Sequence, residues 1–236
     1  MPKFLTKVLK ALIVLVIPIL LIFGSARLLA TDAYLTFEYG KSSFPPDSYG
    51  FTPGQRFILA STNIHYVRAH LPNDELSKQT LNGVPVYNER EVAHMADVQS
   101  VFQAILRVWQ FAFILFLLLA FVFLQNGEGK AFVSAIQSGG LLTSGIIATI
   151  ALTALLAWQT WFNLFHRFLF VEGSWLFSYS DTLIRLFPIR FLFDATLTIS
   201  LLSFIGGLLM VLIGRQWRMA IEQPHRRYNY NLPIEY

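Results

Sequence analysis

The chain has 236 residues, of which 55% are hydrophobic and only 14% are charged, whereas soluble domains average about 25% charged residues, so the balance excludes an ordinary soluble domain. The formal charge of +4 comes without a basic run or a compact basic face and therefore does not indicate nucleic acid. The absence of cysteine excludes thiolate catalysis, disulfides and Cys-ligated metal centres.

The apolar residues gather in four blocks of about 20 residues, the length that a helix needs to cross roughly 30 Å of hydrocarbon. The predicted spans are residues 11–30, 105–124, 141–161 and 195–213. Gly24-Ser25-Ala26 in the first block resembles a signal-peptide cleavage site, but the apolar core is longer than the about 7 to 15 residues of a signal peptide. We therefore expect an uncleaved anchor helix.

Four spans place both termini on one side of the membrane. Basic residues do not separate the two sides by number, but the positive-inside bias acts mainly on short loops, and long segments translocate largely regardless of charge. We therefore expect cytoplasmic termini and an extracytoplasmic, interfacial cap formed by residues 31–104 and 162–194. The predicted fold is all-α, with residues 1–236 forming a single integral domain of the cell membrane.

The first cap segment starts with an aromatic and proline-broken stretch, residues 34–49, that is typical of the membrane interface. Asn82-Gly83 predicts a tight hairpin. From Asn88 onward, apolar residues recur every three or four positions, which predicts a helix that runs directly into the second span.

This predicted helix carries a histidine with two acidic neighbours. Glu91, His94 and Asp97 are spaced by three, so they lie near one another on the helix surface, and either carboxylate could orient the imidazole. An imidazole titrates near neutral pH and can both take and return a proton. His94 is therefore a candidate catalytic residue.

The second cap segment begins as a continuation of the third span. Gln159, Asn163 and His166 fall at i, i+4 and i+7 and form a polar stripe on one helix face. Aromatic residues and Asp181 follow. Asp194 then stands at the start of the fourth span, where it either caps the helix or faces an inner polar site.

Both candidate histidines sit at the extracytoplasmic end of a span, so the two side chains could reach one pocket. A single interfacial histidine is more often structural than catalytic. With two histidines, each near carboxylates, a structural and a catalytic role become about equally probable. We interpret His65, His70 and His225 as non-catalytic, because none has such a set of partners.

A metal site is a second interpretation, since His94, His166, Asp97 and Asp181 offer nitrogen and oxygen ligands. No H-E-x-x-H motif supports it. A serine hydrolase also lacks support, because G-x-S-x-G is absent.

Two stretches carry a family resemblance. Residues 90–98, R-E-V-A-H-M-A-D-V, resemble the R-E-x-x-H-M-x-D-V signature of the lipoprotein intramolecular transacylases, a family of four-span bacterial membrane proteins. Residues 162–194 resemble the second signature of that family, with F-N, F-H, G-S-W, D-T-L-I and F-P in the same order.

The resemblance implies an activity that moves an acyl chain from the diacylglyceryl group of a lipoprotein to the amine of its N-terminal cysteine, giving a lyso-form lipoprotein. It implies His94 and His166 as the catalytic residues, with no cofactor and no metal. We hypothesise that one histidine takes the amine proton and the other protonates the leaving glycerol oxygen. The expected partners are the diacylglyceryl lipoprotein or another lipid substrate and membrane lipid, not nucleic acid.

Supporting roles fall to residues near the two histidines. Asp97 or Glu91 could orient His94, and Asp181 could orient His166. The residues expected to shape the pocket or stabilise an oxyanion are Arg90, Asn163 and Trp175.

Two alternative functions remain open. The same histidines could serve another acyl hydrolase or acyltransferase that acts on phospholipid. The chain could also be a non-catalytic assembly factor or sensor whose histidines are structural. Nothing in the sequence sets the oligomeric state.

Overall fold

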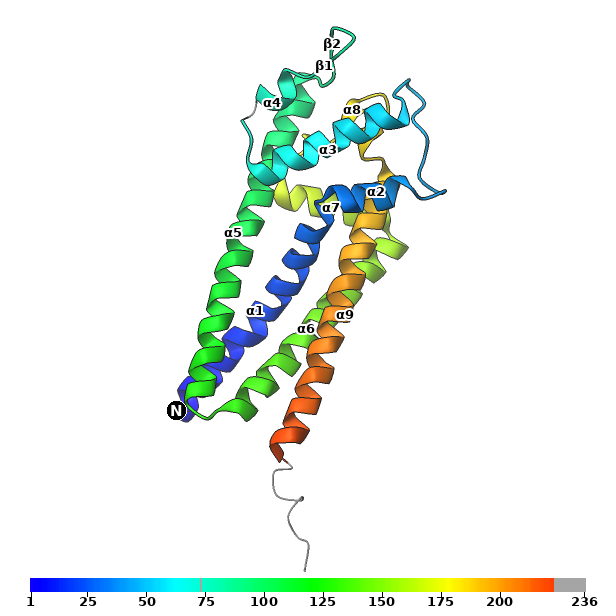
Figure 1. Ribbon diagram of the computed structural model, residues 1–236. Coiled ribbons are helices and arrows are strands. Elements are labelled where there is room, and N and C mark those ends of the chain that lie inside the picture. The colour runs from blue at the N-terminus through cyan, green and yellow to red at the C-terminus, as the bar shows by residue number, and fades with distance from the viewer. Residues whose placement is uncertain (73, 223–236) are drawn as a thin grey trace, which may run out of the picture.

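The computed structural model describes residues 1–72 and 74–222, and most of them form helices. Four long helices lie side by side in a bundle (Figure 1): α1 (Lys3–Leu29), α5 (Glu89–Gln125), α6 (Gly129–Leu156) and α9 (Ile189–Glu222). All four are long and apolar enough to cross a membrane. The chain is therefore an all-α, multi-pass membrane protein, as the four apolar blocks predicted.

The shorter elements form a cap at the end of the bundle opposite the N-terminus (Figure 1). They are α2 (Asp32–Tyr39), α3 (Pro53–Ala69), α4 (Asp74–Ser77), β1 (Thr80–Leu81), β2 (Val84–Pro85), α7 (Trp158–Leu169) and α8 (Thr182–Leu186). The two strands pair antiparallel around Asn82 and Gly83, both of which have positive φ. This turn geometry suits Asn-Gly and confirms the predicted hairpin.

Helix α5 runs without interruption from the cap into the bundle, which confirms the predicted continuity. It begins with a capping box, in which the Asn88 side chain accepts from the Glu91 N–H and the Glu91 carboxylate accepts from the Asn88 N–H. Its 37 residues extend about 55 Å, well beyond the roughly 30 Å of hydrocarbon. The first turns of α5 therefore have room to project into the cap, ahead of the predicted span.

The third predicted span was too long at its end. Helix α6 stops at Leu156, the backbone of Ala157 leaves the helical region, and α7 starts at Trp158 as a separate helix. Apolar side chains of α7 such as Leu164 and Phe168 are exposed, and an amphipathic helix of this kind is stable along the membrane surface. Gln159, Asn163 and His166 thus belong to a cap helix rather than to an extension of the span.

Small residues hold α6 and α9 close together. A Cβ added at Gly140 would lie 2.5 Å from the Gly207 carbonyl oxygen, and one added at Gly207 would lie 2.6 Å from the Ser144 hydroxyl. Helices that meet in a membrane commonly approach through such residues, because packing rather than the hydrophobic effect drives their association. Because α7 follows α6 directly, this tight pair fixes the point at which α7 enters the cap.

Helices α2 and α3 were not predicted, although α3 has 17 residues. The signal that marks its start is a capping box between Thr52 and Gln55, with Pro53 in the first turn. Its buried face includes Arg56 and Asn63, so the apolar periodicity that reveals most helices is weak here.

Asp194 faces an inner polar cluster and does not cap a helix, because α9 already begins at Ile189. Its carboxylate accepts hydrogen bonds from Lys41 at 3.1 Å and Arg190 at 3.0 Å. Lys41 also donates to the fully buried Glu38 at 2.7 Å. The cluster joins α2 to α9 beneath the cap.

Candidate active site

His94 lies on α5 in an aromatic environment. Its imidazole is buried, with ring centroids 5.1 Å from Phe170 and 5.4 Å from Phe177 in edge-on arrangements. Its Nδ1 atom has no hydrogen-bond partner. Because transfer of a charge into such surroundings is costly, they favour the neutral imidazole.

His166 lies on α7 and is held through one nitrogen. Its Nδ1 is 2.8 Å from the Phe162 carbonyl oxygen, which fixes Nδ1 as the protonated nitrogen and leaves the Nε2 lone pair free. Burial lowers the pKa of His166 below its ordinary value, and the Phe162 carbonyl only partly opposes this. The side chain is therefore neutral at pH 7, with a free acceptor nitrogen.

The loop after α7 brings the two histidines together. Phe170 contacts both imidazoles, at 5.1 Å from His94 and 5.7 Å from His166 between ring centroids. Trp175, from the same loop, lies 5.5 Å from His166. The histidines therefore share one aromatic cluster, which we define as Phe170, Trp175 and Phe177.

Three buried polar atoms of this region have no hydrogen-bond partner: Nδ1 of His94, Oγ of Ser174 and Nε1 of Trp175. Buried polar atoms are nearly always paired, so an unpaired group needs an explanation, and a bound ligand is one. Ser174 was not singled out from the sequence. The sequence signal that could have found it is its place in Gly173-Ser174-Trp175, in the loop between Phe170 and Phe177, which both contact His94.

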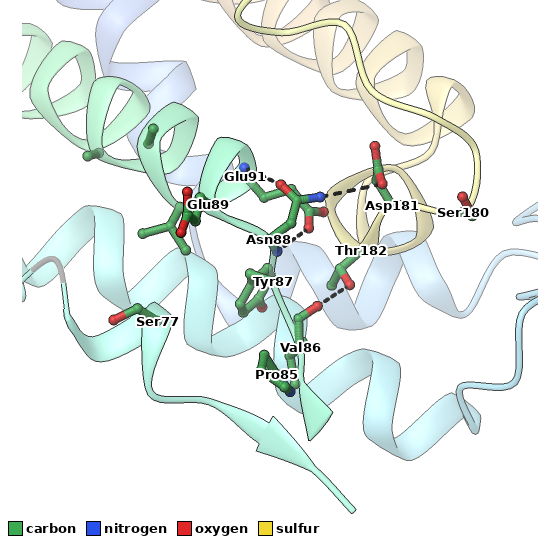
Figure 2. Close-up of a pocket in the computed structure, with 13 residues that line it drawn as sticks. Ser77, Pro85, Val86, Tyr87, Asn88, Glu89, Glu91, Ser180, Asp181 and Thr182 are labelled. Atoms are coloured by element: carbon green, nitrogen blue, oxygen red, sulfur yellow. Dashed lines mark hydrogen bonds between the residues drawn. The ribbon is translucent and has the colours of Figure 1, made fainter. Parts of the chain in front are cut away.

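Glu91 is buried but does not hold His94. Its carboxylate accepts from the N–H of Asn88 at 2.9 Å and from the N–H of Leu183 at 2.7 Å. It lines a surface pocket of about 810 Å³ between the hairpin, the start of α5 and residues 180–182 (Figure 2). Neither histidine lines this pocket.

The other two expected orienting carboxylates do not hydrogen-bond a histidine either. Asp97 is exposed and forms no hydrogen bond within the described residues. Asp181 accepts from the Ser178 N–H at 2.8 Å and lies 3.5 Å from the Asn88 amide, a contact drawn in Figure 2. The site thus contains two neutral imidazoles whose ring nitrogens are not held by carboxylates.

Arg90 contacts the aromatic cluster, and Asn163 pairs with a neighbour along α7. Arg90 donates to the Leu176 carbonyl at 2.8 Å, and its guanidinium lies 5.6 Å from the Phe177 ring centroid, so it fastens the loop to α5. The Asn163 side chain accepts from Gln159 at 3.4 Å, along the predicted polar stripe.

The remaining histidines lie in other settings. His65 is 3.1 Å from the Asp32 carboxylate, and His70 ends α3 in the left-handed region, while His225 lies outside the described residues. Within residues 1–72 and 74–222, no three His, Asp or Glu side chains cluster as metal ligands. The metal interpretation thus finds no ligand set in this part of the chain.

Comparison with known proteins identifies a family. The family model described as lipoprotein intramolecular transacylase Lit matches residues 11–192. A protein of Aquifex aeolicus (strain VF5), described as uncharacterized, is 29% identical over 209 residues, which cover 88% of this chain and 94% of that protein.

Solved structures share the fold. The membrane integral lipoprotein intramolecular transacylase Lit from Bacillus cereus superposes with a TM-score of 0.74 at 17% identity, over 93% of this chain and 98% of that one. A variant of the same protein with one histidine replaced by alanine gives a TM-score of 0.64 at 17% identity, over 93% and 96% of the two chains. At this identity, the likeness concerns the architecture of spans and cap.

Proposed function

The chain belongs to the lipoprotein intramolecular transacylase family, and from this premise we propose that it moves an acyl chain within a diacylglyceryl lipoprotein. The acyl group leaves a glycerol oxygen and joins the α-amino group of the N-terminal cysteine, giving the lyso-form lipoprotein. The observation that carries the proposal is the contact of Phe170 with both His94 and His166, which supports a site that uses both imidazoles as acid/base groups.

Both reacting groups belong to the same substrate molecule. The amine and the ester are held close by the glyceryl thioether, so the chain has only to bind them in a reactive arrangement, and proximity supplies much of the rate. Four apolar helices with an aromatic cap at one end suit such a lipid, because its acyl chains remain in the membrane leaflet. We place this site on the extracytoplasmic side, with cytoplasmic termini.

We assign proton uptake to His166. The Phe162 carbonyl holds its Nδ1 at 2.8 Å, and the free Nε2 lone pair can accept the proton that the amine loses as its nitrogen attacks the ester carbonyl. The His166 imidazolium then passes this proton to one ring nitrogen of neutral His94, while the other ring nitrogen of His94 gives its proton to the glycerol oxygen as the carbon–oxygen bond breaks, so both imidazoles end neutral. The net result is the transfer of one proton from the amine nitrogen to the glycerol oxygen.

The attack creates negative charge on the ester carbonyl oxygen. The unpaired Nε1 of Trp175 and hydroxyl of Ser174 are donors that could stabilise this oxyanion, and donors fixed in a water-poor site stabilise such charge strongly. Arg90 acts as a positioning residue, because it fastens the loop that carries both donors. Asn163 continues the polar edge of the site on α7.

The test is a conversion assay. The purified chain is mixed with a diacylglyceryl lipoprotein in detergent, and the N-terminal peptide is analysed by mass spectrometry. We expect a product of unchanged mass in which one acyl chain has moved to nitrogen. Release of free fatty acid, or transfer from added phospholipid, would contradict the proposal and favour a phospholipid hydrolase or acyltransferase.

A further inference from the structure

A second pocket lies in the cap on the side of α8 and α9. Its volume is about 420 Å³, and segments from the loop before α3, from α3 itself, from α8 and from the start of α9 surround it. Its lining contains three arginines, Arg56, Arg185 and Arg190, but one carboxylate, Asp47. None of these residues has a role in the proposed transfer reaction.

Arg56 is held rigidly and directs part of its guanidinium into this pocket. Only 5% of the residue is exposed, and Nε and Nη1 donate to the carbonyl oxygens of Arg185 and Pro45 at 2.5 and 2.6 Å. The group also lies 4.6 Å from the Phe44 ring centroid. Nη2 forms no hydrogen bond within the described residues, and Arg56 is one of the residues that line the pocket.

Arg185 is held in the same manner. Its Nε and Nη2 donate to the two oxygens of Asp47 at 2.9 and 3.0 Å, which leaves Nη1 without a partner among the described residues. The hydrogen bond from Arg185, with smaller help from the Phe51 and Tyr49 N–H groups, lowers the pKa of Asp47 to about 2 despite its burial. Asp47 is therefore fully charged, and its carboxylate is occupied by the ion pair with Arg185.

The charge of the pocket remains positive. Burial, and to a lesser degree repulsion from Arg185, lowers the pKa of Arg56, although a guanidinium still stays charged at physiological pH. Arg190 pairs with Asp194, but that carboxylate is shared with Lys41. Two rigid guanidinium groups thus repel each other at a pocket whose described lining contains one carboxylate.

The pocket also lies near the membrane. Pro188, Ile189 and Arg190 line it, and the predicted fourth span begins at residue 195, about 10 Å further along the helix. The backbone N–H groups of Ile189, Arg190 and Phe191 donate no hydrogen bond within the described residues. Free N–H groups at the start of a long helix add to the attraction for an anion.

We propose that this pocket binds the phosphate group of an anionic phospholipid from the surrounding leaflet. Guanidinium groups form strong charge-assisted hydrogen bonds to phosphate, and Nη2 of Arg56 and Nη1 of Arg185 are the donors that their own contacts leave over. Basic pockets next to membrane helices bind acidic headgroups by the same chemistry. The choline of a zwitterionic lipid would bring a positive charge against the arginines, so the pocket selects an acidic headgroup.

The experiment measures lipid adducts by native mass spectrometry. The full chain in detergent is offered equal amounts of phosphatidylglycerol and phosphatidylcholine with identical acyl chains. We expect phosphatidylglycerol adducts to exceed phosphatidylcholine adducts about fivefold or more, since each basic residue near an acidic headgroup contributes about 1 kcal/mol.

Two variants change the pocket without removing its buried arginines. Arg190→Gln removes a half-exposed charge, and Ser48→Glu adds a negative charge at an exposed position of the lining. Both should bring the adduct ratio towards one. Arg68→Gln, an exposed position of α3 that does not line the pocket, should keep the wild-type ratio.

Three results would overturn the proposal. The first is a wild-type ratio of one, and the second is a preference that persists unchanged in both Arg190→Gln and Ser48→Glu. The third concerns the source of the phosphate: if inorganic phosphate at equal concentration raises the unfolding temperature as much as phosphatidylglycerol does, the occupant is a free anion and not a lipid.

Discussion

Glu91 on α5 accepts a hydrogen bond of 2.7 Å from the backbone N–H of Leu183 at the start of α8. The same carboxylate closes the capping box of α5. One buried side chain therefore connects the start of the helix that carries His94 to the end of the loop that carries Trp175 and Phe177. Its role is to hold the cap together, in place of the expected contact with His94.

Replacing Glu91 by glutamine should lower stability. A glutamine offers one acceptor oxygen where the carboxylate offers two, so one of the two N–H groups loses its partner in a buried position. We expect a loss of about 1–3 kcal/mol, measured as a lower unfolding temperature in detergent. Glu89→Gln, at an exposed position two residues earlier, is the control. An equal fall in unfolding temperature for both variants would contradict the role of Glu91 in holding the cap together.

The two histidines should be needed for activity and dispensable for folding. His94→Ala or His166→Gln should each reduce conversion to the lyso form by about 10²- to 10⁴-fold, the usual contribution of acid/base catalysis, with an unfolding temperature near that of the wild type. Asp97→Asn should reduce this conversion less than either histidine variant does. His65→Gln, on exposed surface beside Asp32, should retain full conversion.

A fully active, folded His94→Ala or His166→Gln protein would exclude the proposed proton transfers. A loss in Asp97→Asn as large as in the histidine variants, without misfolding, would point to a direct role of the carboxylate or to a metal.

The lowered pKa of His166 predicts a dependence of stability on pH. An unfolded histidine has a pKa of about 6.5, and burial lowers the value in the folded chain. Between these two values the unfolded chain binds a proton that the folded chain does not, so the folded state is fully favoured above about pH 6.5 and loses stability as the pH falls below it. His166→Gln removes this proton-binding difference.

Unfolding temperatures of the wild type and His166→Gln at several pH values between about 7.5 and 5 provide the measurement. On acidification, the unfolding temperature of the wild type should fall more than that of His166→Gln. Parallel curves for the two proteins would show that the folded and unfolded pKa values of His166 do not differ.

The unpaired indole of Trp175 should matter for rate more than for stability. Trp175→Phe keeps a ring beside His166 and removes the Nε1 donor, which should reduce the rate constant of transfer about 10²-fold with little change in substrate affinity. Because that donor is buried without a partner, its removal should leave the unfolding temperature unchanged or higher. Ser174→Ala should act in the same direction.

Trp109→Phe is the matched control. The Trp109 indole donates to the Leu20 carbonyl at 3.1 Å, so this change should cost about 1 kcal/mol of stability and spare the activity. If Trp175→Phe instead destabilised the protein and kept its rate, the indole would be structural and no donor to the substrate.

The approach of α6 and α9 at Gly140 should tolerate no larger side chain. A Cβ there would lie 2.5 Å from the Gly207 carbonyl oxygen, and backbone cannot rotate away as a flexible side chain would. Gly140→Ala should therefore cost about 1–3 kcal/mol. Gly145→Ala, on the same helix with nothing within 4 Å of the added carbon, should be neutral or slightly stabilising, and equal unfolding temperatures for the two variants would contradict this packing.

The sequence by itself determined the features that depend on neighbours along the chain. Spans follow from the local density of apolar residues, so all four were located without tertiary information. The start of α5 follows from the apolar periodicity that begins at Asn88, and the hairpin follows from Asn82-Gly83, because a turn residue carries its backbone preference with it. The pairing of His94 with His166 was expected from their places at the ends of two spans and from the family motifs, and their catalytic role stays a prediction.

Tertiary structure decided which groups the polar side chains bind. No proline or glycine, which usually ends a helix, lies around Ala157, yet α6 stops at Leu156 and α7 begins at Trp158, whose indole packs against Phe193 of α9. Glu91 was expected to meet its neighbour His94 and instead binds Leu183. A buried polar group must find some partner, but the partner closest in sequence has no advantage once folding brings distant backbone groups within reach.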